Sequence, residues 1–220
     1  MNAGPSASRR SWLRRNRIGL VLLPVALVAA LAGNAERLQT LWWEDDLRVP
    51  QRPDSSGVVH VVDAYDDGHH QWPIRPEISL VSVVQADTIP GYDGQPRPVT
   101  VPPGTMMQKV TLHVTADPNM ILGGCTLALA DASGARWESR SGALKTDAQE
   151  PASPCTPDGR SGPGWLPQQP EPVVDADAVR PASYDVASYV VLPVGAKPTE
   201  VWVWWAKPRF AALPIPASAP

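Results

Sequence analysis

The densest group of side chains that could bind a metal lies between residues 63 and 72. This segment reads DAYDDGHHQW and brings His69 and His70 together with three carboxylates, two of which are Asp66 and Asp67. Imidazole and carboxylate groups are ligands for divalent metals such as Zn²⁺ and Cu²⁺. Adjacent histidines on a strand point to opposite faces, however, and the glutamate that completes an EF-hand loop is missing. We therefore expect a solvated loop without a cofactor, with a metal site as the alternative.

Motifs for covalent catalysis are missing from the sequence. It has neither a G-x-S-x-G nucleophile elbow nor S-x-x-K, and no P-loop or Rossmann fingerprint. His113 is expected on the polar face of a strand, exposed to solvent. Nothing in the spacing of the serines and aspartates fixes a triad, so the sequence predicts a protein that is not an enzyme.

The two cysteines, Cys125 and Cys155, are predicted to form a disulfide. We expect both to lie outside the membrane, where an even cysteine count is typical of a disulfide. A bridge across this separation of 30 residues would stabilise the fold by about 3–4 kcal/mol through loop-closure entropy. The alternative is two free thiols, and without a C-x-x-C there are too few cysteine ligands for a metal site.

An aromatic cluster, V-W-V-W-W, occupies residues 201–205. By strand alternation Trp202 and Trp204 share one face, while the valines and the last tryptophan share the other. If the valines face the core, the two tryptophans either pack beneath a proline-rich loop, with Trp165 as a lid, or form an exposed recognition patch. The packed arrangement is favoured, and all three tryptophans are kept as candidate partner-binding residues.

The elements that must position these groups are predicted to be β-strands. Seven short runs are rich in β-branched residues or alternate apolar and polar residues between turn signals. They cover residues 58–62, 77–84, 107–115, 125–130, 135–139, 186–192 and 200–206. Half-buried alternation indicates antiparallel sheets with one wet face, and two such sheets stack into a β-sandwich. The 26 prolines among 220 residues also argue against an all-helical bundle.

The charge distribution predicts a membrane topology. Residues 1–17 hold five arginines and no acid, residues 18–33 form an uncharged apolar run, and the chain after residue 35 sums to −8. The positive-inside rule then predicts an uncleaved signal anchor, single-pass in the cell membrane, which contacts the lipid bilayer through residues 18–35. Its N-terminus would be cytoplasmic and its main domain extracytoplasmic. The overall charge of −3 argues against nucleic-acid binding.

Other interpretations of the N-terminal segment stay open. Small residues at 30–32 and 33–35 fit signal-peptidase sites, so cleavage after Ala32 or Ala35 would release the domain. A plain buried helix would leave the arginines unexplained. The motif S-R-R-S-W-L-R at 8–14 resembles a twin-arginine export signal, with departures at Trp12 and Arg14.

The predicted organisation has five parts. They are a basic cytoplasmic tail (1–17), a transmembrane helix with an extracytoplasmic extension (18–48), a linker (49–57), the β-sandwich (58–210) and a flexible tail (211–220). Within the sandwich, residues 149–172 hold seven prolines and three glycines. This density excludes regular structure, so we expect a long loop that is functional or disordered.

Three sequence segments together resemble a known kind of domain. V-P-P-G-T at 101–105, followed by a long strand, matches its opening; L-P-V-G-A-K at 192–197, before the strand at 201–205, matches its close. The D-A-S-G turn at 131–134 also fits. Residues 75–210 thus resemble the immunoglobulin-like domain of small exported or membrane-anchored Gram-positive bacterial proteins of uncharacterised function. The resemblance implies a fold rather than an activity, and the chain departs from it in lacking a lipobox cysteine and in the 149–172 insertion.

Together these features predict a non-catalytic, membrane-anchored envelope protein. It would present an immunoglobulin-like domain as an accessory or binding module, and a membrane protein complex is a candidate partner. One alternative is a metal-binding envelope protein that uses the His69/His70 region. The other is a secreted wall-associated or carbohydrate-binding protein, released by signal-peptide cleavage.

Overall fold

The computed structural model describes one α-helix, two larger β-sheets, two two-stranded hairpins and most of the connections between their strands. Described are Trp12, Arg37 and Val173 and residues 15–35, 46–66, 71–91, 93–139, 153–164 and 176–216; for Tyr65, Asp66 and Ala176 only the backbone is described. The chain divides into two compact units, Met1–Asp46 and Leu47–Pro220.

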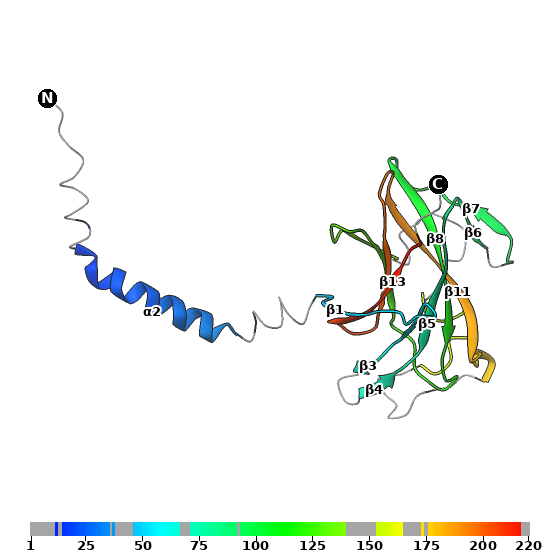
Figure 1. Ribbon diagram of the computed structural model, residues 1–220, viewed down its shortest axis with the longest axis horizontal. Coiled ribbons are helices and arrows are strands. Elements are labelled where there is room, and N and C mark those ends of the chain that lie inside the picture. Colours follow the sequence, from blue (N-terminus) through cyan, green and yellow to red (C-terminus); the bar gives the residue numbers. More distant parts are fainter. Residues whose placement is uncertain are drawn as a thin grey trace. The chain divides into compact units, whose positions relative to one another are not determined.

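The first unit contains helix α2 (Arg17–Gly33), which the apolar run forms (Figure 1). Its 17 residues span about 25 Å at about 1.5 Å per residue, less than the ~30 Å of a bilayer's hydrocarbon core. Among the described residues, no helix combines the length and the apolar character that a membrane span requires. This finding overturns the predicted single-pass anchor over residues 18–48 and the localisation in the cell membrane that followed from it.

The predicted extension of this helix to residue 48 is wrong at its end. Leu47 is only 7% exposed and packs within the second unit, where the Arg48 N–H donates to the Pro208 carbonyl at 2.9 Å. These residues lead into β1 (Val49–Gln51), which pairs in parallel with β13 (Arg209–Pro214).

The predicted linker over 49–57 and flexible tail over 211–220 therefore both contain sheet residues. Residues 210–213 are buried, and this burial fixes a strand although the segment has no β-branched alternation and is followed by prolines. Strand formation here depends on tertiary packing, which outweighs local propensity.

The second unit is built on two β-sheets (Figure 1). One has the strand order β1-β13-β12-β9-β10 and the other β11-β8-β5-β2, and every pair except β1–β13 is antiparallel. The remaining strands are β2 (Val58–His60), β5 (Glu77–Ala86), β8 (Thr105–Thr115), β9 (Thr126–Ala130), β10 (Arg136–Glu138), β11 (Ser183–Pro193) and β12 (Glu200–Trp204). The two sheets agree with the predicted β-sandwich, whereas the membrane helix expected before it is not found.

Two small hairpins lie outside the main sheets and were not predicted. They pair β3 (Asp63–Asp66) with β4 (Gln71–Ile74), and β6 (Thr88–Pro90) with β7 (Pro96–Pro98). Prolines in both hairpins disturb the alternation that marks a strand. The second hairpin covers part of the four-stranded sheet, where Ile89 packs with Met107 and Tyr189. A short 3₁₀ turn, η2 (Ala176–Ala178), precedes β11.

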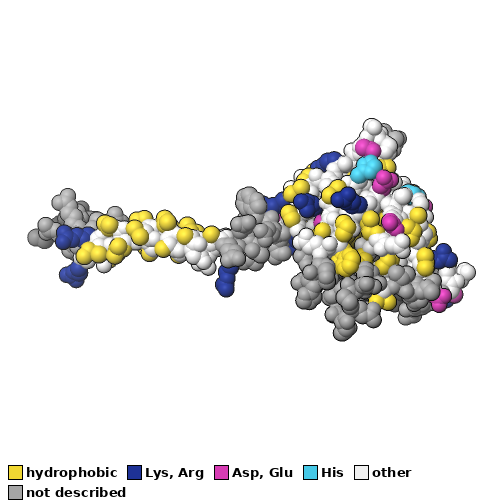
Figure 2. All heavy atoms as spheres, turned by 90° about the horizontal axis from the view of Figure 1, so that it is seen from below, with side chains coloured by type: hydrophobic (Ala, Val, Ile, Leu, Met, Phe, Trp, Pro, Cys, Tyr) yellow, Lys and Arg dark blue, Asp and Glu magenta, His cyan; other side chains and the backbone are white. Residues whose placement is uncertain are grey.

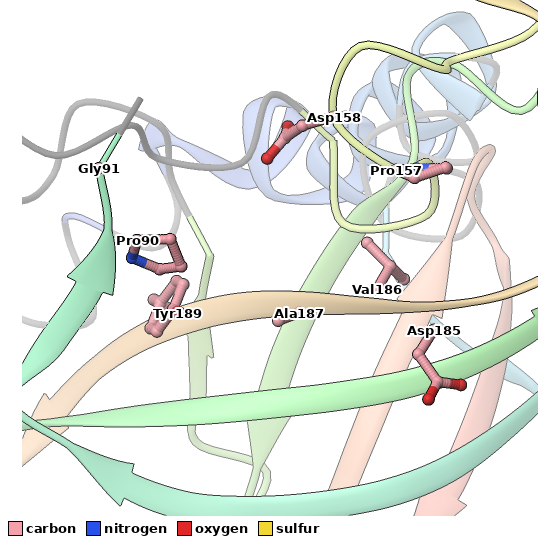
Figure 3. Close-up of a pocket in the computed structure, with 8 residues that line it drawn as sticks. All are labelled: Pro90, Gly91, Pro157, Asp158, Asp185, Val186, Ala187 and Tyr189. Carbon is pink, nitrogen blue, oxygen red and sulfur yellow. The ribbon is translucent and has the colours of Figure 1, made fainter. Parts of the chain in front are cut away.

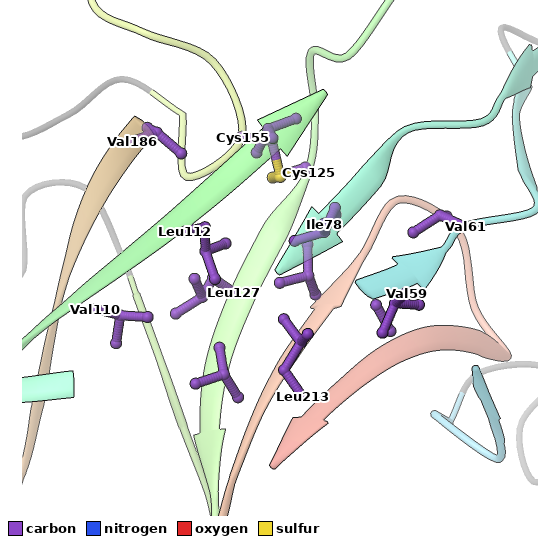
Figure 4. Close-up of a cluster of buried hydrophobic side chains, with 14 of the residues drawn as sticks. Val59, Val61, Ile78, Val110, Leu112, Cys125, Leu127, Cys155, Val186 and Leu213 are labelled. Carbon is purple, nitrogen blue, oxygen red and sulfur yellow. A yellow bond between two sulfur atoms is a disulfide. The ribbon is translucent and has the colours of Figure 1, made fainter. Parts of the chain in front are cut away.

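The hydrophobic core lies between the two sheets (Figure 4). Val110, Leu112 and Val114 of β8 point inward, as their alternation predicts, and are buried. Leu127 of β9 and Leu213 of β13 belong to the same cluster and come from the opposite sheet. Each sheet therefore packs one face against the core, and its other face points outward.

Candidate functional site

The predicted metal site stays untested. Asp67, His69 and His70 lie outside the described residues, and of Asp66 only the backbone is described, within β3. Among the side chains that are described, no three His, Cys, Asp or Glu residues group closely enough to hold a metal ion.

The tryptophans of β12 lie as strand alternation predicts. Val201 and Val203 are buried in the core, and Trp204 points to the opposite face of its sheet, where it is only 7% exposed. There it packs in a cluster with Leu47 and Phe210. The cover comes from the segment that precedes β1, while Trp165, the predicted lid, lies outside the described residues.

Trp202, on the same outer face, is partly exposed but has contacts within the protein. Its indole N–H donates to a Glu200 carboxylate oxygen at 2.7 Å, and its ring centroid lies 4.4 Å from that of Phe210. The Arg136 guanidinium lies 5.8 Å from the ring centroid, and Arg52 pairs with Glu200. Burial alone would raise the pKa of Glu200, but the hydrogen bonds from Arg52 and Trp202 lower it below its ordinary value. These contacts favour a structural role.

The outer face of the four-stranded sheet carries a series of hydrogen-bonded polar side chains. His113 on β8 lies opposite Asp185 on β11, and its Nδ1 is 2.7 Å from an Asp185 carboxylate oxygen. Ser183, also on β11, places its Oγ 3.0 Å from His113 Nε2. Thr115 on β8 extends the series, with its Oγ1 3.3 Å from the Ser183 Oγ.

The register of β8 and β11 explains why these side chains meet. The Ala116 N–H donates to the Ala182 carbonyl at 2.9 Å, so every second pair along this antiparallel ladder is hydrogen-bonded. Ser183 and Asp185 belong to the intervening, non-hydrogen-bonded pairs, in which side chains approach more closely. At these positions the N–H and C=O groups of β11 point away from β8. Since β11 is an edge strand among the described strands, they face the free edge of the sheet.

The contacts run from hydroxyl to imidazole to carboxylate, the order that activates a serine nucleophile. The side chains of His113 and Asp185 are 44% and 61% exposed, which agrees with the predicted exposure of His113. Hydrolases combine such groups with preorganised N–H donors in a site that excludes water, whereas this group lies on an open strand surface. Sequence reasoning missed Ser183 and Asp185, which lie 70 and 72 residues from His113 and meet it only through the register.

A second histidine lies on the same sheet. His60 on β2 has one ring nitrogen 3.2 Å from an Asp54 oxygen and the other 3.3 Å from a Glu77 oxygen. Histidine and acidic side chains lie side by side on the surface in view in Figure 2. The outer face of this sheet therefore carries titratable side chains beside exposed valines of β5, Val81 and Val84.

A pocket of about 220 Å³ opens beside β11 (Figure 3). Pro90 and Gly91, Pro157 and Asp158, and β11 residues between 185 and 189 line it. Val186 lines the pocket although its side chain also packs in the core, and the neighbouring Asp185 and Ala187 turn main-chain groups to the free edge of β11. Tyr189 is 8% exposed, and its burial, followed by the nearby Asp158 charge, raises its pKa.

The disulfide holds one wall of this pocket in place. Cys125 and Cys155 are bonded, which confirms the predicted bridge and ties the loop that carries Pro157 to the start of β9. The Tyr184 hydroxyl donates to the Cys155 carbonyl at 2.7 Å. Burial raises the pKa of Tyr184 to about 12, so this phenol keeps its proton and its donor role at neutral pH.

A buried arginine provides a second anchor for the same loop. Arg180 is 1% exposed and donates to the Ser161 carbonyl at 3.1 Å and to the Asp117 and Met120 carbonyls at 2.6 and 2.7 Å. Burial lowers its pKa from the usual value. The three acceptors join the loop to the turn after β8, and no sequence pattern marked Arg180 for this role.

A second pocket, of about 250 Å³, lies between β4 and residues 117–121. Its carboxylate, Asp117, accepts a hydrogen bond from the Asn119 N–H at 2.8 Å and so stabilises its own turn. The pocket beside β11 differs in combining two carboxylates, a buried phenol and strand main chain.

The chain matches no protein-family model, no curated protein and no solved structure. Conclusions about function therefore depend on the geometry of the sandwich itself.

Proposed function

We propose that the sandwich is a non-catalytic binding module that works in an oxidising compartment and contacts a protein partner through the pocket beside β11. The observation that carries this proposal is the pocket, in which strand main chain lies beside Asp158, Asp185 and Tyr189. The disulfide supports the compartment, because such bridges persist where the surroundings are oxidising.

The immunoglobulin-like character of the module is proposed from its strand order. In immunoglobulin sandwiches strands G, F, C and C′ form one sheet, and strands B and E are neighbours in the other. Strands β13, β12, β9 and β10 take the first positions, and β8 and β11 take the second. The disulfide departs from this pattern, because it joins the start of β9 to a loop instead of joining B to F.

Site-specific photo-crosslinking tests the binding function. We would place a photoreactive phenylalanine at Ala187, which lines the pocket, and as a control at Ser133, in the turn between β9 and β10, in the full chain produced in its native cells. We expect a discrete crosslinked partner from position 187 and none from position 133. No adduct from either position, or the same adducts from both, would count against a partner at this pocket.

A second candidate function, ester or amide hydrolysis, is favoured by the contacts among Ser183, His113 and Asp185. In that reaction the Ser183 Oγ would attack a carbonyl carbon while its proton moves to His113 Nε2. A fluorophosphonate probe distinguishes the two functions, because it labels only activated serines. Labelling of the wild type that disappears in Ser183→Ala and His113→Ala would establish hydrolysis, and an unlabelled wild type would leave binding as the function.

A further inference from the structure

We propose that the pocket beside β11 accepts one lysine or arginine side chain of a partner polypeptide. This inference rests on the binding function proposed above and adds the chemistry of the ligand. Three features of the pocket support it: its charge, the strand edge beside it and its size.

The charge of the pocket selects a cation. Asp158 and Asp185 line it, and no lysine, arginine or histidine does. One oxygen of Asp185 lies 2.7 Å from His113, which fixes the orientation of the carboxylate and leaves its second oxygen without a hydrogen bond among the described residues. The nearby Arg97 pairs with Asp93 at 2.7 Å, so its charge is already compensated.

Tyr189 supplies a polar group at the wall of the pocket. The residue is 8% exposed, it lines the pocket, and its hydroxyl makes no hydrogen bond among the described residues. The raised pKa of Tyr189 keeps the phenol neutral, and its oxygen can accept from an ammonium or guanidinium group.

The main chain of β11 offers further groups to a polypeptide ligand. Asp185 and Ala187 occupy non-hydrogen-bonded positions opposite β8, so their N–H and C=O groups face the free edge. Extended peptides bind such edges through main-chain hydrogen bonds, while individual side chains enter neighbouring pockets. The ligand is thus expected to be a basic residue within an extended segment rather than a free metal ion.

The size of the pocket fits one side chain. Its volume of about 220 Å³ is below the ~300–1,000 Å³ of sites for drug-sized ligands. Pro90 and Pro157 provide apolar wall on either side of the carboxylates, against which the methylene stem of a lysine or arginine can pack.

NMR titration of the full chain with three small probes tests the inference. The probes are Nα-acetyl-lysine methylamide, its norleucine analogue and its glutamate analogue, followed by ¹⁵N shifts of residues 185–189. We expect the lysine probe to bind with a Kd of about 1 mM, as its few atoms allow, and the other two probes at least tenfold more weakly. The Asp158→Asn/Asp185→Asn variant should lose this preference, while Glu77→Gln, with a carboxylate removed from β5, should keep it.

The outcomes separate this inference from the binding function. Equal shifts with the lysine and norleucine probes would overturn the selection of a cation, and so would an unchanged Kd in the double variant. No shifts with the lysine probe at about 10 mM would overturn the site as well. A crosslinked partner at position 187 that persists in the double variant would then preserve the binding function with a different ligand chemistry.

Discussion

The two outer faces of the sandwich differ in what their side chains contact. On the five-stranded sheet, Trp204 is buried beneath Leu47, and Trp202 contacts Phe210 and Glu200. On the four-stranded sheet, His113 and its polar neighbours remain in solvent, next to a pocket. The face with aromatic residues is covered by the protein's own chain, while the face with His113 and Asp185 leaves titratable side chains exposed.

This difference shows why residue type alone misleads about function. A pair of tryptophans on one strand face is typical of a recognition patch, yet burial of such large apolar surface also stabilises a fold. The covering residue decides between the two roles, and here Leu47 precedes the tryptophans by more than 150 residues in the chain. Variants on either face test whether the two faces differ in this way.

The largest effect is expected on the closed face. Trp204→Ala should lower the free energy of unfolding by about 3–5 kcal/mol, because it leaves a cavity beneath Leu47. Trp202→Ala, at the partly exposed neighbour, serves as the matched variant and should cost less. Urea unfolding followed by circular dichroism measures both. Similar small losses for the two variants would mean that this face is not a structural cluster.

The second-largest loss of stability is expected at the disulfide, which connects the core to the loop beside the four-stranded sheet. Cys125→Ala/Cys155→Ala should lower the free energy of unfolding by about 3–4 kcal/mol, because the bridge closes a separation of 30 residues. It should also weaken binding of the lysine probe, since the loop with Pro157 and Asp158 loses its anchor. Measurement under conditions where the variant is still folded keeps the two effects apart. Full probe affinity in the folded variant would show that the loop does not need the bridge.

The sequence predicted the fold better than the site, and the strands show why. Alternation is local, so β8 was expected at 107–115 and is found at Thr105–Thr115. Strand β13 was missed because its residues form a strand only through pairing and burial. The contact of His113 with Asp185 depends on register between strands 72 residues apart, and the three acceptors of Arg180 lie in two separate loops. Neither set of contacts leaves a pattern in the local sequence.

On the open face, the series of polar side chains should contribute little to stability. His113→Ala and Ser183→Ala are each expected to change the free energy of unfolding by less than about 1 kcal/mol, because hydrogen bonds and ion pairs between exposed groups are weak. The same urea experiment as for Trp204→Ala makes the comparison direct. A loss above about 2 kcal/mol would contradict a face reserved for ligands.

The smallest effect concerns the turn that leads into β2 on the same sheet. The Asp54 carboxylate accepts hydrogen bonds from the Ser56 Oγ at 2.6 Å and from the Ser56 and Val58 N–H groups at 2.8 and 3.2 Å. These bonds, with Ser56 contributing most, hold the pKa of Asp54 well below its ordinary value. A lowered folded-state pKa stabilises the fold above the unfolded-state pKa of about 4, and this stabilisation is lost as pH falls through the folded-state value.

Asp54→Asn should therefore unfold at a slightly lower urea concentration than the wild type at pH 7, and the difference should shrink as pH falls below about 4. Asp87→Asn is the matched control, because it removes the same charge from a side chain with no hydrogen bond among the described residues. It gives the effect of losing one carboxylate that accepts no such bonds. An Asp54→Asn difference that stays constant from neutral to acidic pH would contradict a stabilisation by the charge of Asp54. The turn would then depend on the hydrogen-bonding shape of the side chain, which asparagine shares.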